Sequence, residues 1–325
     1  MQTAIECIPC FVRQAAEAVA LCEPDSGRRE RLLRRVLGEI AEADWGGMPV
    51  TIAQQIQRVV RAEAGQADPY RSVKDRMNRA ALDLLPALVA DARRQPDPRE
   101  ALVRLAIAGN LLDSGAKTGI SAAELPGILQ TIHNRTLVGS VEDLFRASGA
   151  AHCILYLADN AGEIIFDRLL IEALPAEKIT VAVRGAPVIN DATLEDAELA
   201  GIPEIAPVIS NGSDAPGTIL AECSEDFHYW YDRADLVISK GQGNYETLSE
   251  TRKNVFFLLT VKCPLIAAHI GAPVGSMVIC RRGNAEMKAP ALLITCERVS
   301  GLPFLDSRFH GNDDHSESNQ TFSTA

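Results

Sequence analysis

The chain has 325 residues, 47% of them apolar, and carries a formal net charge of -11 with a pI near 5.1. A chain of this length and apolar content buries a sizeable core, in one large domain or two smaller ones, which excludes disorder throughout. The acidic balance argues against a general binder of nucleic acid or of membrane surfaces, because both need a basic face. We therefore expect a small-molecule or protein partner.

No apolar run approaches the roughly 20 residues that span a membrane. The first residues, MQTAIECIPCF, also lack the basic start and the long apolar stretch of a signal peptide. The sequence therefore predicts a cytoplasmic protein. Its eight cysteines are scattered, and only Cys7 and Cys10 are close together, which is typical of reduced thiols and not of a disulfide framework.

The first part of the chain carries apolar residues at helical spacings of three and four almost throughout. We expect helices at 11–21, 28–43, 51–64, 71–92 and 98–112, and a further helix start at the capping box Ser121 to Glu124. The pattern predicts an all-helical N-terminal domain or cap at residues 1–145.

Polar groups within this helical region have two interpretations. Lys74 and Asn78 lie one turn apart on one helix face, either as substrate contacts or as part of a solvated face. Gly109 interrupts a helical pattern just before Asn110, at a cost of about 1 kcal/mol relative to alanine. Either close helix packing or a bound ligand explains that glycine.

Cys7 and Cys10 form a CxxC pair near the start of the chain. Two thiols at this spacing chelate a soft metal or cycle as a disulfide, but a structural zinc site needs four ligands and the chain has no second CxxC. The pair is therefore either a partial metal or redox site or two buried cysteines at a helix start.

From about residue 146 the pattern changes to strand, turn and helix. We expect strands at 154–158, 178–183, 204–209, 236–239, 255–261 and 275–280, with helices at 164–173, 193–200, 218–231 and 245–253 between them. This alternation predicts an α/β fold at residues 146–282, in which a doubly wound, mostly parallel sheet forms the middle of three layers.

Oxygen-bearing side chains follow two of the expected strands. Asp159 and Asn160 come directly after the first strand, and Asp191 follows the second after a short turn. Ligands of open α/β sheets collect at the carboxyl ends of strands, and these side chains are ligands that magnesium or manganese accepts. For either aspartate alone, a helix N-cap is an equally good explanation.

A glycine-rich turn follows a third strand, with the sequence Lys240-Gly-Gln-Gly-Asn244. Glycines between a strand and a helix let backbone N–H groups approach an anion, and the lysine supplies a point charge for phosphate. The candidate substrate and phosphate contacts are Lys240, Gly241, Asn244, Lys262, Asn110, Lys74 and Asn78.

Several motifs in a fixed order resemble the domain-of-unknown-function 89 family. They are CIPC at 7–10, AGN at 108–110, LADNAGE at 157–163, GAPVINDAT at 185–193, SKGQGNYETL at 239–248 and VKCPLIA at 261–267. The resemblance covers residues 4 to about 282, and the CxxC is similar to that of the prokaryotic branch. Members are described as damage-control phosphatases with an acidic-residue-methyltransferase-like metal-binding fold.

The resemblance implies a site and a reaction. It places a divalent metal ion (Mn, Ni, Co or Mg) on the residues matching Asp159, Asn160 and Asp191, a phosphate-binding lysine on Lys240, and Glu163 near the substrate. The implied reaction is hydrolysis of small phosphometabolites, such as sugar phosphates or phosphopantetheine-like compounds.

Three hypotheses follow for the function. In a metal-dependent phosphomonoester hydrolase, Asp159 is the first candidate for nucleophile or base and Glu163 the second. A carboxyl methyltransferase that uses S-adenosylmethionine keeps the fold but has little need of two carboxylate strand ends. In a non-catalytic metal or redox protein, Cys7 and Cys10 serve a protein partner.

The C-terminal segment 283–325 is polar and lacks an amphipathic period, so we expect it to be largely disordered. Its run FLDSRFHGNDDH resembles translated intergenic repeat DNA of bacteria, which indicates a non-native end of the reading frame.

Overall fold

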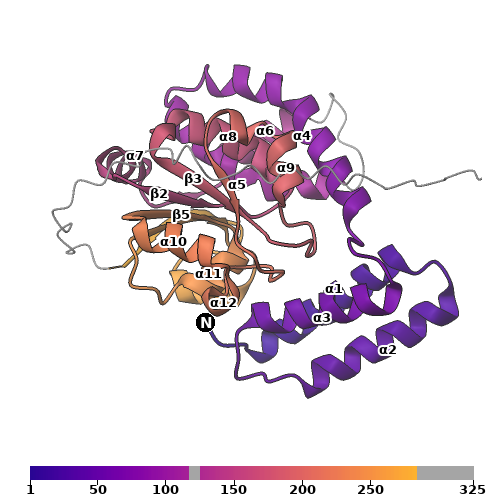
Figure 1. The fold of residues 1–325 in the computed structure, drawn as a ribbon. Helices are drawn as coiled ribbons and strands as arrows, with labels where there is room; N and C mark the ends of the chain where they lie inside the picture. Colours follow the sequence, from indigo (N-terminus) through magenta and orange to yellow (C-terminus); the bar gives the residue numbers. More distant parts are fainter. Residues whose placement is uncertain (117–124, 284–325) are drawn as a thin grey trace, which may run out of the picture.

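The computed structural model describes residues 1–116 and 125–283. Its centre is a seven-stranded sheet with the strand order β1-β7-β6-β5-β2-β3-β4 (Figure 1). The strands are β1 (Leu137–Val138), β2 (Ile154–Leu157), β3 (Ile179–Val183), β4 (Val208–Ser210), β5 (Leu236–Lys240), β6 (Val255–Thr260) and β7 (Met277–Arg282).

The topology is doubly wound, as predicted. β2 pairs in parallel with both β3 and β5, so the chain builds one half of the sheet from β2 to β4 and then returns to build the other half from β5. The carboxyl ends of β2 and β5 therefore meet at a topological switch point, where open α/β sheets bind their ligands. β7 is antiparallel to β6, which leaves the sheet mostly and not wholly parallel.

Helices cover both faces of this sheet. They are α1 (Ile8–Cys22), α2 (Ser26–Glu42), α3 (Pro49–Ala64), α4 (Arg71–Ala92), α5 (Pro98–Ala116), α6 (Leu125–Asn134), α7 (Val141–Ala150), α8 (Glu163–Ala173), α9 (Leu194–Leu199), α10 (Glu225–Arg233), α11 (Gln242–Leu248) and α12 (Pro264–Ile270). Short 3-10 turns occur at Ile5–Cys7, Ala176–Lys178, Ile202–Glu204 and Leu220–Glu222. Figure 1 shows α8 and α9 on one side of the strands and α10 to α12 on the other.

The strands are buried on both faces because their side chains alternate between two cores. In β2, Ile154 and Tyr156 join the core shared with α4, α5 and α8, whereas Leu155 and Leu157 join the core shared with α10 and α11. All four side chains are buried, which explains why the strand is an unbroken apolar run in the sequence.

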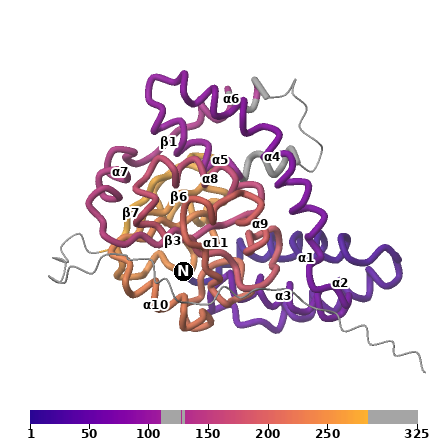
Figure 2. Tube along the Cα trace, turned by 45° about the horizontal axis from the view of Figure 1, so that its top comes forward, coloured from indigo at the N-terminus to yellow at the C-terminus, as the bar shows by residue number. Residues whose placement is uncertain are grey.

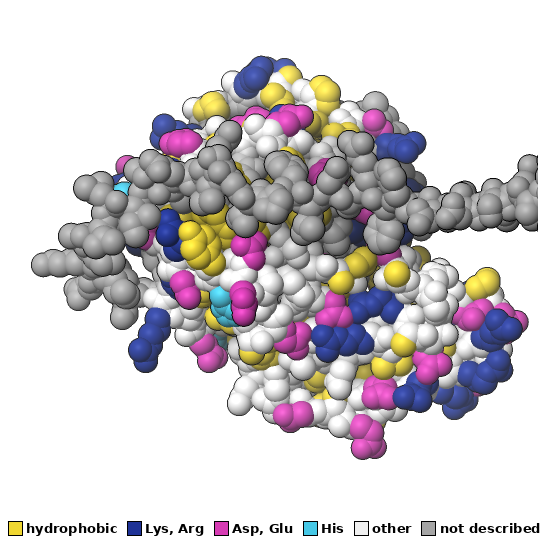
Figure 3. All heavy atoms as spheres, viewed as in Figure 1, with side chains coloured by type: hydrophobic (Ala, Val, Ile, Leu, Met, Phe, Trp, Pro, Cys, Tyr) yellow, Lys and Arg dark blue, Asp and Glu magenta, His cyan; other side chains and the backbone are white. Residues whose placement is uncertain are grey.

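Helices α1, α2 and α3 form a separate bundle with the first half of α4. The second half of α4 leaves this bundle and packs, together with α5, in the same core as the sheet. Figure 2 shows α4 running from the bundle toward the body of the protein, and Figure 3 shows side chains of both charges over the outer surface of the bundle.

The helices expected before residue 112 are all present with similar bounds. The short strand β1 also occurs in this region, which was expected to be all-helical. The helix expected at 218–231 begins only at Glu225, because Ser224 caps it by accepting a hydrogen bond from the Phe227 N–H. The helix expected at 245–253 lies earlier, as α11 directly after the glycine turn.

Three expectations concern residues outside the described ranges. The capping box Ser121 to Glu124 and the tail after Gly283 are outside them, and nothing is described of the Asn110 side chain within α5. Within residues 1–116 and 125–283, no helix is both long and apolar enough to cross a membrane.

Gly109 of α5 lies where this helix packs against α8. A Cβ atom at this position would lie 2.5 Å from Cγ and 2.8 Å from Cα of Glu163. Close helix packing therefore explains the glycine. By contrast, a Cβ atom on Gly38, within α2, would meet nothing within 4 Å.

We expect Gly109→Ala to lower the free energy of unfolding by about 1–3 kcal/mol, because overpacking outweighs the better helix propensity of alanine. The matched control Gly38→Ala should raise it by about 0.5–1 kcal/mol. Urea denaturation of both variants measures the difference. Equal effects at the two positions would contradict the close contact between α5 and α8.

Candidate metal and phosphate site

The loop after β2 pairs with the loop after β3. Asn160 and Asp191 form an antiparallel bridge, and the Ala192 N–H donates to the Asp159 carbonyl at 2.8 Å. The Ala161 N–H donates to the Asn190 carbonyl at 2.9 Å. These backbone bonds bring together the two oxygen-rich strand ends that the sequence pattern singles out.

Asp159, Asn160 and Asp191 are buried, with only 7%, 6% and 4% of their surface exposed. Asn160 Nδ2 donates to Asp159 Oδ2 at 2.7 Å and to Glu163 Oε2 at 3.2 Å. Space for the Asp159 carboxylate depends on Gly241, since a Cβ atom there would lie 1.9 Å from Asp159 Oδ2. Gly241 also has a φ of 78°, which glycine adopts without strain.

Arg184, directly after β3, interacts with both Asp159 and Asp191. Its Nε donates to Asp191 Oδ2 at 2.6 Å, and its Nη2 lies 3.6 Å from Asp159 Oδ1. Nη1 donates to Asn244 Oδ1 at 3.1 Å. The guanidinium thus links groups that follow three different strands of the sheet.

Lys240, the last residue of β5, is fully buried. Its Nζ donates to Glu163 Oε1 at 2.6 Å, to Asp167 Oδ1 at 2.5 Å and to the Ala106 carbonyl at 2.7 Å. Tyr156 also donates to Asp167 Oδ1, at 2.8 Å. All three ammonium protons of Lys240 are therefore used by α5 and α8 in this conformation.

Burial raises the pKa values of three carboxyl groups in this cluster. Burial raises the pKa of Glu163 to about 7 and the pKa of Asp191 to about 7, against the opposing effects of Lys240 and Arg184. Burial also raises the pKa of Asp167. For Lys240, burial lowers the pKa, but the adjacent Asp167 and Glu163 carboxylates outweigh it, so that the net direction is upward.

The donor set fits a hard divalent cation. Four buried carboxylates face two buried cations, so the fully ionised cluster carries two uncompensated negative charges; the residues are Asp159, Glu163, Asp167, Asp191, Arg184 and Lys240. No group of three or more His, Cys, Asp or Glu side chains is arranged as a metal site in the described ranges. The predicted set has two carboxylates, and the Asn160 amide is the third ligand.

Lys74 and Asn78 attach α4 to the site. Lys74 Nζ pairs with Asp196 Oδ2 at 2.7 Å, and Asn78 Nδ2 donates to Asp196 Oδ1 at 2.8 Å. Asn78 Oδ1 accepts from the Gly162 N–H at 2.6 Å. Both α4 side chains are at most 3% exposed, so the interpretation as a solvated helix face is wrong.

The other candidate phosphate contacts lie in different environments. The Gly241 N–H donates to the Leu258 carbonyl at 3.1 Å as part of the sheet. Asn244 is fully buried, and its Nδ2 donates to the Lys240 carbonyl at 2.8 Å. Lys262, just after β6, is exposed. Asn244 thus supports the loop, whereas Lys262 is accessible.

The CxxC lies at the start of α1. Cys7 is half-buried and Cys10 is exposed, and both are free thiols. Burial raises the pKa of Cys7, which disfavours the thiolate that redox and metal chemistry require. The alternative of two buried cysteines is wrong, since Cys10 is exposed and Cys7 is only half-buried.

A cluster of ion pairs attaches the α1–α3 bundle to the sheet. Asp214 accepts hydrogen bonds from Arg58 at 2.6 Å and Gln54 at 2.8 Å, and also pairs with Arg61. Arg61 donates to the Pro187 carbonyl at 2.6 Å, on the loop that carries Asp191. We call Gln54, Arg58, Arg61 and Asp214 the latch.

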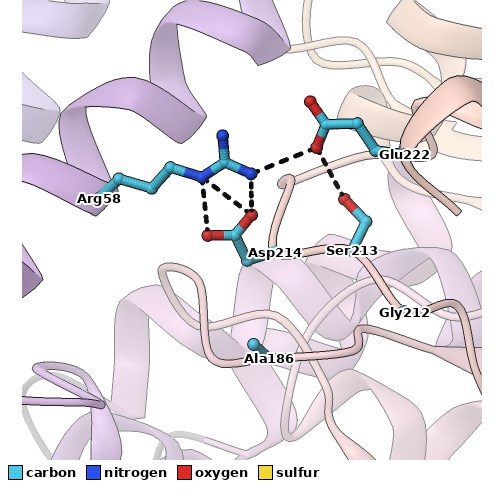
Figure 4. Close-up of a pocket in the computed structure, with 6 residues that line it drawn as sticks. All are labelled: Arg58, Ala186, Gly212, Ser213, Asp214 and Glu222. Atoms are coloured by element: carbon cyan, nitrogen blue, oxygen red, sulfur yellow. Dashed lines mark hydrogen bonds and ion pairs between the residues drawn. The ribbon is translucent and has the colours of Figure 1, made fainter.

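A cavity of about 430 Å³ opens beside the latch. Figure 4 shows Arg58, from α3, directed at Asp214 and Glu222, with Ala186 on the loop below them. The bundle thus contacts the segment between β4 and α10 through charged side chains.

Sequence reasoning missed Arg184, Asp167 and Asp196 as members of the site. Arg184 directly follows the β3 apolar run, so its position at a strand end is a signal that the pattern contains. Asp167 lies within α8 and Asp196 within α9, where an acidic residue is unremarkable. Only the tertiary structure shows that both carboxylates are buried against lysines.

The fold and the side chains described above define a doubly wound α/β protein with a buried, acidic cluster at its switch point. A family model described as damage-control phosphatase ARMT1-like domain matches residues 3–278. The chain belongs to this family.

The matches to several relatives extend over most of this chain and most of each relative. A damage-control phosphatase of Archaeoglobus fulgidus is 34% identical over 84% of this chain and 96% of its own, and an uncharacterised protein of Methanocaldococcus jannaschii is 37% identical over 85% and 94%. The crystal structure of a DUF89 family protein from Pyrococcus horikoshii superposes with a TM-score of 0.78 at 32% identity, covering 86% of this chain and 99% of that chain. The predicted family and fold class are confirmed.

We expect Lys240→Met to lower the free energy of unfolding by about 3–5 kcal/mol, because it leaves two buried carboxylates without their cation. Adding Asp167→Asn should recover part of this loss. Lys178→Met is the control, since that ammonium donates only to the Gly149 carbonyl at the surface. Urea denaturation in metal-free buffer measures all three. A loss below about 1 kcal/mol would contradict the role of Lys240 as counter-ion.

Asp214 gives a prediction for the pH dependence of stability. Burial would raise its pKa, but hydrogen bonds from Arg58, Gln54 and Arg61 outweigh burial and lower the pKa to about 2. A lowered carboxyl pKa stabilises the fold above the unfolded value near 3.9, and this contribution disappears as the pH falls through about 2.

Asp214→Asn should therefore cost about 1–2 kcal/mol at pH 7 and about half of that near pH 3. The expected loss of stability is this small because Arg58 is half-exposed, so solvent screens its interaction with Asp214. Urea denaturation at several pH values measures the difference from the original chain. Asp143→Asn, in a surface pair with Arg146, should show no such pH dependence. A constant difference between pH 7 and pH 3 would argue against the latch.

Proposed function

We propose that the protein is a divalent-metal-dependent phosphatase that hydrolyses small phosphorylated metabolites. The observation that carries the proposal is the bridge between Asn160 and Asp191, which places Asp159, Asn160 and Asp191 together at the switch point. The phosphatase names of the relatives support the reaction type. The excess of buried negative charge supports a divalent cation, of which manganese, nickel, cobalt and magnesium are the candidates.

Asp159, Asn160 and Asp191 would hold the metal ion. When bound there, a divalent ion screens the phosphate charge and lowers the pKa of a coordinated water. Gly241 leaves room for the Asp159 carboxylate, and Arg184 keeps Asp191 oriented by its hydrogen bond of 2.6 Å. The protein supplies a fixed cluster of oxygen ligands before substrate arrives, which is the preorganisation that catalysis requires.

Asp159 is the candidate nucleophile or base, and Glu163 the second candidate. Lys240 fixes the position of the Glu163 carboxylate through its hydrogen bond of 2.6 Å. Lys262 is exposed at the end of β6, where it is a candidate contact for the charged substrate. These roles place general acid–base chemistry and phosphate recognition on different strand ends.

The α1–α3 bundle and α4 would close over the substrate. Asn78 connects α4 to the loop after β2, and Lys74 connects α4 to Asp196 of α9. Arg61 connects α3 to the loop that carries Asp191. Opening of the bundle would therefore expose both loops, and closure would exclude water from the site. Substrate selection would depend on side chains of the helical region.

The test is phosphate release from a panel of sugar phosphates and phosphopantetheine-like compounds, with manganese, nickel, cobalt or magnesium in turn. Asp159→Asn should lower the best rate by at least about a hundredfold and weaken metal binding by at least about tenfold, because it removes the negative charge of a ligand. Calorimetry measures the metal affinity, and Asp143→Asn is the surface control.

Chelation of the metal should abolish activity of the unmodified protein, and re-addition of metal should restore it. Two results would overturn the proposal. One is an absence of phosphate release with every metal and substrate. The other is an Asp159→Asn protein that keeps full metal affinity and full activity.

A further inference from the structure

The site contains two buried cations, and they differ in how many of their protons are used. Lys240 has three N–H donors, and all three have protein acceptors, in Glu163, Asp167 and the Ala106 carbonyl. For Lys240 to hold a phosphate as well, at least one of these buried partners would have to be released. Release of a buried carboxylate from its cation is costly.

Arg184 has a different arrangement. It is 3% exposed, and its Nε and Nη1 are held by Asp191 and Asn244 at 2.6 and 3.1 Å. Its Nη2 has no hydrogen-bond acceptor among the residues that the structure describes. Nη2 lies 3.6 Å from Asp159 Oδ1, which is an ion pair without a hydrogen bond.

The unsatisfied Nη2 therefore lies beside the first candidate metal ligand. Buried guanidinium N–H groups without acceptors are costly. An N–H of a guanidinium donates a charge-assisted hydrogen bond to a phosphate oxygen. A phosphate oxygen next to Asp159 would satisfy this donor without disturbing the bonds to Asp191 and Asn244.

We propose that Arg184 Nη2 binds the phosphoryl group of the substrate, whereas Lys240 is a positioning residue for Glu163. This inference rests on the proposed phosphatase function and names a phosphate contact within its site. Arg184 is held by residues that follow β2, β3 and β5, so phosphate recognition depends on the same strand ends as the metal ligands. The ligand class is a phosphate monoester or inorganic phosphate.

The experiment compares Arg184→Lys and Arg184→Gln with the unmodified protein. Calorimetry with inorganic phosphate on magnesium-saturated protein measures phosphate affinity, and a separate magnesium titration measures metal affinity. Arg146→Lys is the matched control, since Arg146 forms a surface pair with Asp143. Thermal unfolding confirms that each variant is folded.

We expect both Arg184 variants to bind phosphate about ten- to a hundredfold more weakly, because a charge-assisted hydrogen bond is lost. Because Arg184 also orients Asp191, magnesium affinity should fall as well, but phosphate affinity is measured at saturating magnesium and should still be lower. KM for a phosphate ester should rise at least about tenfold. A purely structural role for Arg184 predicts that magnesium affinity falls while phosphate affinity at saturating magnesium stays unchanged.

Unchanged phosphate affinity in both variants overturns the inference and leaves the phosphatase proposal standing. An unmodified protein that neither binds phosphate nor hydrolyses any ester overturns both. If neither variant folds, NMR of the unmodified protein with isotope-labelled arginine decides. The inference requires a buried guanidinium N–H signal that shifts when phosphate is added, and it is overturned if no arginine responds.

Discussion

The balance of buried charge at the carboxyl ends of β2, β3 and β5 is the constraint on which the site depends. A doubly wound sheet brings these three ends together, and each contributes ionisable side chains. Four carboxylates and two cations share this volume, and none of them is more than 7% exposed. Because a buried charge without a partner is costly, the surrounding elements must hold every one of these groups in a fixed position.

The two cations compensate different carboxylates. Lys240 compensates the carboxylates of α8, and Arg184 compensates those of the loops after β2 and β3. Close packing depends on glycines, since a side chain at Gly109 would displace Glu163 and one at Gly241 would displace Asp159. The latch then connects the bundle to the loop that carries Asp191. The candidate metal ligands, their counter-ions and the α1–α3 bundle are thus parts of one network.

Much of this arrangement could be predicted from the sequence, for a physical reason. Asp159, Asn160 and Asp191 follow apolar runs, and the ends of parallel strands share an edge of the sheet, so their proximity follows from the fold class. The contacts of Lys240 could not be predicted in this way. Asp167 lies within a helical pattern, and the Ala106 carbonyl lies on α5, so both contacts depend on how the helices pack over the sheet.

The lysine of the glycine-rich turn shows why residue type and spacing leave a role open. A lysine after a strand and before glycines is typical of a phosphate site, but it is equally typical of a counter-ion for a neighbouring helix. Donor capacity separates the two roles, because three ammonium protons are used by three acceptors whereas a guanidinium has five. Lys240 has reached its capacity in this structure, and Arg184 retains an unsatisfied Nη2 beside Asp159. The count of donors therefore favours the arginine as the phosphate contact.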